Sequence, residues 1–292
     1  GHVMTCENCS IALTYHRSAD RLNCHYCGYS VPNVDHCPEC GSKYIKFFGT
    51  GTQKIEEDLN NLFPSARVLR MDTDTTSGKN GHENILRRFG EGEADILLGT
   101  QMVTKGLDFH DVTLVGVLAA DTALNVDDFR AHERCFSLLT QVCGRAGRGD
   151  LEGRAIIQTY QPQNATIQFA QNHNYIDFYK SEILYRKRLN YPPFCDIICI
   201  MISGEDEQQV SENMRAIYDL LRKESGKSDD MQMLAPVPAP ILKIKNKYRY
   251  RILIKCNSTE KTTELLHKVN TKHEKMKGKT FLSIDINPNS LY

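Results

Sequence analysis

Six of the eleven cysteines in this 292-residue chain stand in three Cys-x-x-Cys pairs within its first forty residues. The pairs are Cys6 with Cys9, Cys24 with Cys27, and Cys37 with Cys40. Two thiolates at this spacing can hold one face of a tetrahedral zinc ion, and the following Gly28 and Gly41 permit the tight turn that directs both sulfurs inward. The segment up to about residue 45 is poor in periodic apolar residues. We therefore expect its folding to depend on a bound metal.

Two alternatives to this zinc interpretation, and one question within it, can be weighed from the sequence. The chain shows no signal peptide and no apolar run near the roughly 18 residues that cross a bilayer, which favours metal binding in the cytoplasm over a disulfide framework and predicts no membrane partner. A redox role for the thiols is disfavoured by three repeated pairs with zinc-type glycines. Because one closed site needs two pairs, six cysteines make one full site and leave one pair short. His16 or His36 could complete the second site, and this alternative stays open.

The pattern changes after residue 45 to alternating strands and helices. Short apolar runs suited to buried parallel strands occur at residues 45–48, 66–71, 95–98, 114–118 and 155–160. Between them, one expected helix carries Ile55, Leu59, Leu62 and Phe63 on a single face, and another runs from His132 through Val142. This alternation predicts an α/β fold with a doubly wound parallel sheet.

The remainder of the chain predicts a connector and a second, smaller domain. A helical connector is expected over residues 165–189, before Tyr191-Pro192-Pro193, where a helix is disfavoured. Residues 196–286 then predict a small α+β domain with strands and helices in the order βαββαβ. The predicted regions are a Cys-rich zinc-binding region over 1–45, an α/β lobe over 46–165, a connector over 166–190 and a C-terminal domain over 191–292.

Two motifs in the α/β lobe carry chemistry. Gly99 to Phe109 reads GTQMVTKGLDF and directly follows an expected strand, at the strand end where α/β sheets bind ligands. Gln141 to Arg148 reads QVCGRAGR, in which glycines remove side chains beside two arginines. Arginines so placed can stabilise charge on a transferred phosphoryl group, although a lone helical arginine is more often simply solvated. No Gly-x4-Gly-Lys-Ser/Thr phosphate loop occurs in the 292 residues.

Charge is distributed unevenly although the formal net charge is zero. Residues 1–185 hold 17 Lys and Arg against 23 Asp and Glu, whereas residues 186–292 hold 19 against 13. Six basic residues and no acidic one lie between positions 243 and 255: Lys243, Lys245, Lys247, Arg249, Arg251 and Lys255. Strand alternation from Tyr248 separates an apolar and tyrosine face from a basic face. The basic face predicts contact with nucleic acid, and the alternative is an ordinary solvated face.

The two motifs in this order resemble motifs V and VI of superfamily-two helicases. Cysteine pairs before GTGTQKIEEDL, a YPPF junction and a basic C-terminal domain make the whole chain resemble the PriA (primosomal protein N′) family of replication-restart helicases. The resemblance implies a second RecA-like lobe with a zinc-knuckle insertion, followed by the family's C-terminal domain. It implies ATP-driven 3′→5′ unwinding of DNA at stalled forks and reloading of the replicative helicase by primosome assembly.

The resemblance also assigns roles to individual residues. Arg145 and Arg148 become arginine fingers supported by Gln141, Gly106 and Asp108 become nucleotide-side residues, and Thr100 and Gln101 become DNA-backbone contacts. Cys6, Cys9, Cys24 and Cys27 would share one zinc, while Cys37 and Cys40 would belong to a second. The implied cofactors are zinc, two per full-length chain, with ATP and magnesium as substrate. The implied partners are branched and single-stranded DNA, the single-stranded DNA-binding protein, and primosome and helicase-loader proteins.

The chain departs from the family pattern in two ways. The family has four Cys-x-x-Cys pairs, and its first RecA-like lobe carries the phosphate loop that this sequence lacks. We therefore expect a C-terminal fragment that is inactive as an ATPase by itself. The alternative is a stand-alone zinc-dependent DNA-binding or scaffold protein without ATPase function. The two hypotheses differ in whether adding the N-terminal half restores ATP hydrolysis.

Overall fold

The computed structural model describes residues 2–16, 19–44, 51–72, 75–76, 80–100, 103, 109–149, 151–226, 231–257, 260–276 and 278–291. The chain divides into two compact units. One unit contains Gly1–Phe47, Asp127–Phe129 and Ile183–Tyr292, and the other contains Phe48–Val126 and Arg130–Glu182. The Cys-rich region and the C-terminal domain, which are far apart in the sequence, therefore belong to the same unit.

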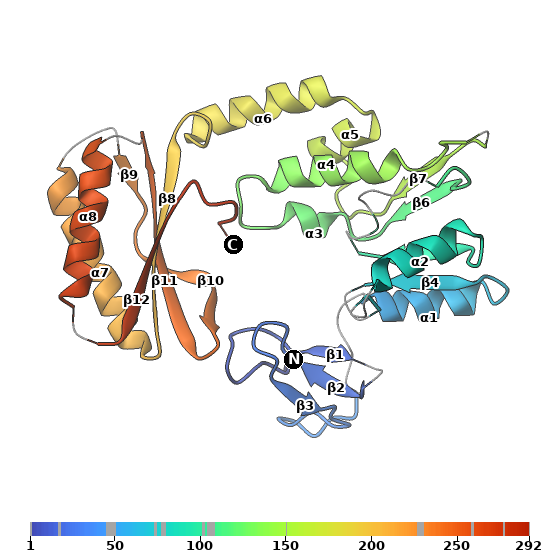
Figure 1. Ribbon diagram of the computed structural model, residues 1–292, viewed down its shortest axis with the longest axis horizontal. Helices are drawn as coiled ribbons and strands as arrows, with labels where there is room; N and C mark the ends of the chain where they lie inside the picture. The colour runs from blue at the N-terminus through green and yellow to red at the C-terminus, as the bar shows by residue number, and fades with distance from the viewer. Residues whose placement is uncertain are drawn as a thin grey trace. The chain divides into compact units, whose positions relative to one another are not determined.

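The Cys-rich region folds around a small antiparallel sheet (Figure 1). Its strands are β1 (Thr14–His16), β2 (Arg21–Asn23) and β3 (Ser30–Pro32), with β2 in the middle. Among the described residues of this region, the buried apolar side chains are Leu22 and three cysteines, Cys6, Cys9 and Cys24. So little buried apolar surface cannot stabilise a segment of this length, which agrees with the expected dependence on metal.

The second unit contains two pairs of parallel strands with helices between them. β4 (Val68–Met71) pairs with β5 (Ile96–Gly99), and β6 (Leu114–Val117) pairs with β7 (Arg154–Ile157). The helices are α1 (Thr52–Leu62), α2 (Gly81–Gly90), α3 (Asp121–Leu124), α4 (Ala131–Cys143) and α5 (Ala165–Gln171). The predicted mixed α/β class is confirmed. Among the described residues the strands pair two by two, so a single wound sheet stays a prediction.

Helix α4 holds the core of this unit. Its buried Phe136 and Leu139 pack with Ile167 of α5 and with Phe178 of α6 (Tyr175–Leu189). The rings of Phe136 and Phe178 stack with centroids 4.1 Å apart. Because α4 is anchored along its length, the loop that follows its last residue, Cys143, starts from a defined position.

The predicted helical connector is interrupted rather than continuous. Helix α5 ends at Gln171 and α6 begins at Tyr175. Between them His173 takes a left-handed backbone conformation with φ of 50°. The side chain of Asn174 then accepts a hydrogen bond of 3.1 Å from the backbone N–H of Asp177, which caps the first turn of α6.

The C-terminal domain is a sheet with two helices on one face (Figure 1). Its elements in chain order are β8 (Asp196–Gly204), α7 (Glu207–Ser225), β9 (Met231–Met233), β10 (Val237–Ile244), β11 (Lys247–Cys256), α8 (Glu260–Glu274) and β12 (Thr280–Ile286). The strands lie in the order β10-β11-β8-β12, and β9 also pairs with β11. The predicted βαββαβ order therefore missed one strand, β10.

The core of this domain lies between the sheet and its helices. Ile198, Ile200 and Ile202 of β8 and Ile252 and Ile254 of β11 are buried there. Side chains of α7 and α8 cover them, and these are Val210, Met214, Ile217, Leu221, Leu265, Leu266 and Val269. In the described part of the chain, no helix combines the length and apolar character needed to cross a membrane.

Candidate metal centre and arginine loop

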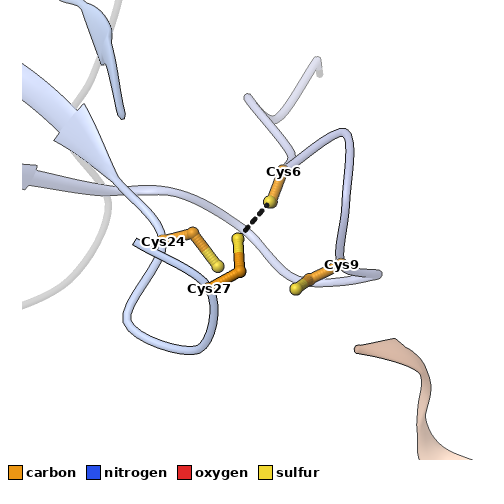
Figure 2. Close-up of side chains that lie close together, drawn as sticks. All are labelled: Cys6, Cys9, Cys24 and Cys27. Carbon is orange, nitrogen blue, oxygen red and sulfur yellow. Dashed lines mark hydrogen bonds between the residues drawn. The ribbon is translucent and has the colours of Figure 1, made fainter. Parts of the chain in front are cut away.

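Four cysteine thiols meet in the Cys-rich region (Figure 2). The sulfurs of Cys6, Cys9, Cys24 and Cys27 all lie within 4.8 Å of one another, and those of Cys6 and Cys27 are 3.5 Å apart. Four sulfurs around a tetrahedral zinc at 2.3 Å are separated from one another by about 3.8 Å. The number, chemistry and spacing of these thiols therefore fit a closed structural zinc site, which is the site predicted from the sequence.

Short backbone turns hold the two cysteine pairs. The N–H of Cys24 donates to the carbonyl of Tyr29 at 2.8 Å, and Gly28, with φ of 76°, donates to the carbonyl of Cys24 at 2.9 Å. A positive φ of this kind is readily adopted by glycine, which explains Gly28 directly after the pair. Two backbone N–H groups also donate to sulfur: Tyr29 to Cys27 at 3.4 Å and Lys245 to Cys9 at 3.3 Å.

Without a metal, the thiols of Cys6 and Cys27 have pKa values shifted in opposite directions. Burial raises the pKa of Cys6 to about 12, because desolvation disfavours the thiolate. The N–H donated by Tyr29 lowers the pKa of Cys27 to about 7. A divalent cation would be bound by all four groups as thiolates, and it would offset the cost of burying their charge.

The third cysteine pair has the same turn, and the described residues add no further metal ligand to it. Cys37 donates its N–H to the carbonyl of Ser42, and Gly41, with φ of 66°, donates to the carbonyl of Cys37, both at 2.9 Å. Within the described ranges, no histidine, carboxylate or further cysteine joins Cys37 and Cys40 to make a group of three ligands. The hypothesis that His16 or His36 completes a second site therefore gains no support from the described residues.

The predicted arginine motif forms a loop directly after α4. The helix ends at Cys143, so Arg145 and Arg148 lie beyond it rather than on it. Arg145 is half-buried, whereas Arg148 is exposed and its Nε donates to the carbonyl of Gly144 at 2.9 Å. Gln141 is exposed in the last turn of α4, where its Nε2 donates to Ser137 Oγ at 3.3 Å. The three predicted side chains thus lie within one helix end and the loop that follows it.

Close backbone packing fixes the course of this loop. Gly147 has φ of 71° and donates its N–H to the carbonyl of Val112 at 3.0 Å. A Cβ at Gly147 would lie 2.7 Å from the nitrogen of Gly153, and one at Gly149 would lie 2.7 Å from the carbonyl oxygen of His110. Gly147 of the motif and Gly149 directly after it therefore permit close approach of neighbouring backbones, and this packing orients the loop that carries the two arginines.

The first motif is described only in part. Thr100 directly follows β5, and its carbonyl accepts the N–H of Val103 at 3.2 Å. The predicted residues Gln101, Gly106 and Asp108 lie outside the described residues. At Gly99 a Cβ would lie 2.7 Å from the carbonyl oxygen of Met71, so β5 ends in close contact with the end of β4.

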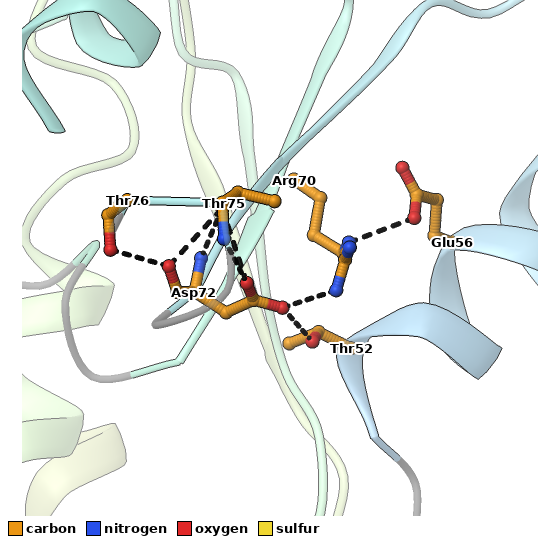
Figure 3. Close-up of polar contacts among 6 residues, drawn as sticks. All are labelled: Thr52, Glu56, Arg70, Asp72, Thr75 and Thr76. Carbon is orange, nitrogen blue, oxygen red and sulfur yellow. Dashed lines mark hydrogen bonds and ion pairs between the residues drawn. The ribbon is translucent and has the colours of Figure 1, made fainter. Parts of the chain in front are cut away.

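A buried carboxylate that the sequence interpretation missed lies at that end of β4 (Figure 3). Asp72 is 6% exposed and accepts hydrogen bonds from Thr52 of α1 at 2.6 Å, from Arg70, and from the N–H of Thr75 at 3.0 Å. Burial acts to raise its pKa, but these hydrogen bonds and the charge of Arg70 outweigh burial and hold the pKa below 3.8. Its position directly after an apolar strand was the signal that could have identified it.

The basic residues near the β10–β11 turn have varied surroundings. Arg249 is half-buried, and burial lowers its pKa. The Lys247 ammonium lies 4.1 Å from the ring centroid of Phe281, and the Lys243 ammonium lies 5.5 Å from that of Tyr248. Arg251 differs from the prediction that it meets phosphate: it is 6% exposed, bonds to the carbonyl of Leu291 and lies 3.3 Å from Asp127.

Comparisons with known proteins find similar sequences over nearly the whole chain. Three family models match it: the PriA DNA helicase Cys-rich region at 6–32, the helicase conserved C-terminal domain at 38–150 and the primosomal protein N C-terminal domain at 187–289. The replication restart protein PriA of Bacillus subtilis is 48% identical over 99% of this chain. The PriA proteins of Synechocystis and Chlamydia pneumoniae are 43% and 38% identical over 100% and 98% of it. The chain is similar to PriA proteins over nearly its whole length.

The match covers a limited part of each PriA relative. This chain spans 36% of the Bacillus subtilis protein, 35% of the Synechocystis protein and 38% of the Chlamydia pneumoniae protein. The four-cysteine cluster lies inside the region that matches the PriA Cys-rich model, and the arginine loop lies inside the region that matches the helicase model. The basic strand β11 lies inside the region that matches the PriA C-terminal model.

Proposed function

We propose that this chain is the C-terminal part of an ATP-dependent 3′→5′ DNA helicase that recognises stalled replication forks and restarts replication by primosome assembly. The observation that carries the proposal is that a Cys-rich region, a helicase region and a PriA C-terminal region follow one another in a single chain. Such a protein acts on chromosomal DNA, so its proposed place is the cytoplasm.

The motor role is assigned to the second unit. We propose that residues 46–165 form a RecA-like lobe, a proposal supported by the two parallel strand pairs and by the helicase match. Arg145 and Arg148 are the proposed arginine fingers, and Gln141 supports them. Their guanidinium charge would stabilise the transferred γ-phosphoryl group of an ATP that a partner lobe holds with magnesium. Gly106 and Asp108 are proposed to couple that nucleotide to DNA, which Thr100 and Gln101 contact.

The metal role is structural. We propose that Cys6, Cys9, Cys24 and Cys27 hold one zinc ion, because four thiols in this geometry leave no open position for a substrate. Cys37 and Cys40 are proposed to belong to a second zinc site of the full-length protein. The zinc then supplies folding free energy to the 1–45 region, whose own core is small.

The DNA role is assigned to the 191–292 domain, which residues 166–190 connect to the lobe. Lys243, Lys245, Lys247 and Arg249 are the proposed direct contacts with branched and single-stranded DNA. Arg251, which is buried, would act by holding β11 in place. Further proposed partners are the single-stranded DNA-binding protein and the primosome and helicase-loader proteins.

A chimera tests the motor assignment. The N-terminal part of the Bacillus subtilis relative, joined to this chain, should hydrolyse ATP when DNA is added, and the 292 residues alone should not. Arg145→Ala and Arg148→Ala should each lower turnover of the chimera by about 10³-fold, because a finger stabilises charge in the transition state. Arg154→Ala is the matched control, since Arg154 is an exposed arginine of β7 in the same unit. It should leave turnover unchanged.

Two results would contradict the motor assignment. Hydrolysis by the isolated chain would show that it holds nucleotide by itself. A chimera that binds zinc and DNA but never hydrolyses ATP would favour the rival hypothesis, a zinc-dependent DNA-binding scaffold.

Charge reversal tests the DNA surface. Lys247→Glu with Arg249→Glu should weaken binding of single-stranded DNA and flatten its dependence on salt, because fewer counterions are released. Lys223→Glu is the control, since Lys223 is exposed on α7, on the helical side of the same domain. An unchanged affinity and salt dependence in the double variant would remove this surface from the proposal.

A further inference from the structure

The tip of the β10–β11 hairpin touches the loop between Cys6 and Cys9. The N–H of Lys245 donates to Cys9 Sγ at 3.3 Å, although the two residues are 236 positions apart. Two backbone hydrogen bonds flank this contact: Ser10 N–H to the carbonyl of Lys243 at 2.9 Å, and Asn246 N–H to the carbonyl of Asn8 at 2.8 Å. The C-terminal domain therefore places a peptide N–H on one of the four candidate metal ligands.

The conformation of the hairpin tip makes these contacts possible. Lys245 and Asn246 have φ of 50° and 61°, so both lie in the left-handed region that two-residue hairpin turns of type I′ require. Their N–H groups are thereby turned away from the ladder between β10 and β11. The sheet alone leaves these donors without a partner, and the metal-binding loop supplies the acceptors.

Side chains strengthen the same contact. Lys243 Nζ donates to the carbonyl of Glu7 at 2.9 Å, and Asn246 Nδ2 donates to Asn8 Oδ1 at 3.1 Å. Ile244 packs against the apolar cluster that contains Cys6 and Cys9. Every residue from 243 to 246 thus contributes a contact to the Cys-rich region.

A hydrogen bond to a metal-bound thiolate stabilises its negative charge and fixes the direction of the sulfur. The Lys245 donor is available to Cys9 only while the hairpin is docked. Thermodynamic reciprocity then requires that docking strengthens metal binding and that metal binding strengthens docking by the same factor.

We propose that residues 243–246 form the outer layer of the zinc centre, so that zinc binding and docking of the C-terminal domain are one coupled equilibrium. The proposal rests on the zinc site proposed above. Loss of zinc would release the hairpin, and with it the basic side chains that the tip carries. The Cys-rich region would then hold the hairpin of the proposed DNA-binding domain only while the metal is bound.

Metal exchange tests the coupling in the 292-residue chain. The double variant Lys243→Ala/Asn246→Gly removes both side-chain bonds and keeps a residue that tolerates the left-handed turn. Loss of the groups that contact metal ligands weakens metal affinity by about 10-fold at the lower end. We therefore expect zinc to pass to a chromophoric chelator about 10-fold faster than in the parent chain. Loss of these bonds should loosen the tip and withdraw the Lys245 N–H from Cys9. With cobalt in place of zinc, the thiolate-to-metal charge-transfer band should then move to lower energy, because a sulfur that accepts fewer hydrogen bonds is a better electron donor. Lys223→Ala, on α7, should change neither quantity.

Hydrogen exchange tests the reverse direction. Removing zinc should accelerate exchange at the N–H groups of Ser10, Lys245 and Asn246, while those of Ile200 and Ile252 in the domain core stay protected. A chain that binds one zinc at the four cysteines but shows equal release rates and equal exchange would overturn the coupling and leave the zinc site standing. A chain that binds no zinc at these cysteines would overturn both.

Discussion

At the scale of single residues, one buried carboxylate organises the end of the first parallel strand pair. Asp72 joins the loop after β4 to the first turn of α1 through Thr52 and to Arg70, which also pairs with Glu56 at 3.0 Å (Figure 3). Helix α1 has no side-chain cap of its own and no buried residue. The hydrogen bond from Thr52 to Asp72 is therefore one of the main contacts that hold α1 on the end of β4.

Asp72→Asn should destabilise the second unit by about 2 kcal/mol at pH 7, because a neutral amide cannot match several donors in a buried site. The pKa of Asp72 is lowered from 3.8, so its contribution is present above that pH and is lost as the pH falls below it. Urea unfolding followed between pH 7 and pH 3 measures both effects. The parent chain should lose stability toward pH 3, and the variant should lose less.

Asp58→Asn is the matched control, since Asp58 is exposed on the same helix. Equal stability of the Asp72 variant and the parent at pH 7 would show that the network contributes nothing.

Gly147→Ala tests the close packing of the arginine loop. Alanine there must adopt φ of 71° with its Cβ 2.7 Å from the backbone nitrogen of Gly153, so we expect a loss of about 1–3 kcal/mol in unfolding free energy. Gly116→Ala is the control, because a Cβ at that strand position meets no atom within 4 Å. Similar thermal unfolding of the two variants would contradict the role given to Gly147.

The sequence predicted the metal cluster better than it predicted Asp72. Cys-x-x-Cys spacing is local, so the pairs that contain Cys9 and Cys27 could be identified without any structure. Asp72 gains its importance from Thr52 and Arg70, which reach it only after α1 and β4 have packed. The contact of Lys245 with Cys9 is less accessible still, because it joins residues 236 positions apart.

At the scale of elements, local chemistry explains which strands the sequence predicted. β8, β11 and β12 alternate or carry long apolar runs and were predicted close to their observed bounds. β10 contains Pro238 and Pro240, which cannot donate to a ladder and argue against a strand. The structure accommodates them because β10 lies at the edge of the sheet, with an irregular register to β11 between Pro238 and Lys243.

Alternation along β11 predicted one of its faces and left the other open. Ile252 and Ile254 are buried against α7 and α8, as the pattern indicates. The opposite face carries Arg251, which contacts Leu291 and Asp127. Both residues are far from Arg251 in the sequence, so no local pattern indicates these contacts. Burial of this arginine could therefore not be deduced from the strand itself.

Arg251→Ala should lower the stability of the C-terminal domain by about 2 kcal/mol, through lost packing of the side chain and loss of its bond to Leu291. It should leave the salt dependence of DNA binding unchanged, because its guanidinium is buried. Arg249→Ala, two residues earlier, should show the opposite pattern. Titrations at several salt concentrations, with thermal unfolding, measure both. A flatter salt dependence in the Arg251 variant would show that Arg251 meets phosphate.

At the scale of the whole molecule, a short segment from the middle of the chain belongs to the unit that contains both ends. Asp127–Phe129 lies between α3 and α4 in the sequence but clusters with the C-terminal domain. Phe129 is buried, stacks on Tyr191 with centroids 4.9 Å apart and lies under the guanidinium of Arg186 at 5.0 Å. Asp128 accepts the N–H of Leu291 at 3.1 Å.

Phe129→Ala should therefore destabilise the C-terminal domain, although residue 129 lies far before that domain in the sequence. We expect a local loss of about 3 kcal/mol from removing a buried ring. Hydrogen exchange should accelerate at Ile197, which packs with Phe129, and stay unchanged along β4 and β5. The measurement is exchange resolved to single peptides.

Leu124→Ala, five residues earlier, is the matched control. Leu124 is buried against α4 in the other unit, so its loss should accelerate exchange along α4 and spare Ile197. If the two variants accelerated exchange in the same segments, Asp127–Phe129 would not be part of the C-terminal unit.

The contact between Lys245 and Cys9 also has a consequence for synthesis on the ribosome. The cysteine loop is translated first, and its hairpin partner follows 236 residues later. At about 5–20 residues per second this delay amounts to about 10–50 s. During that interval the nascent thiols lack the Lys245 donor and, under the proposed coupling, would hold metal less firmly. A cell short of zinc would therefore lose newly made chains more readily than finished ones.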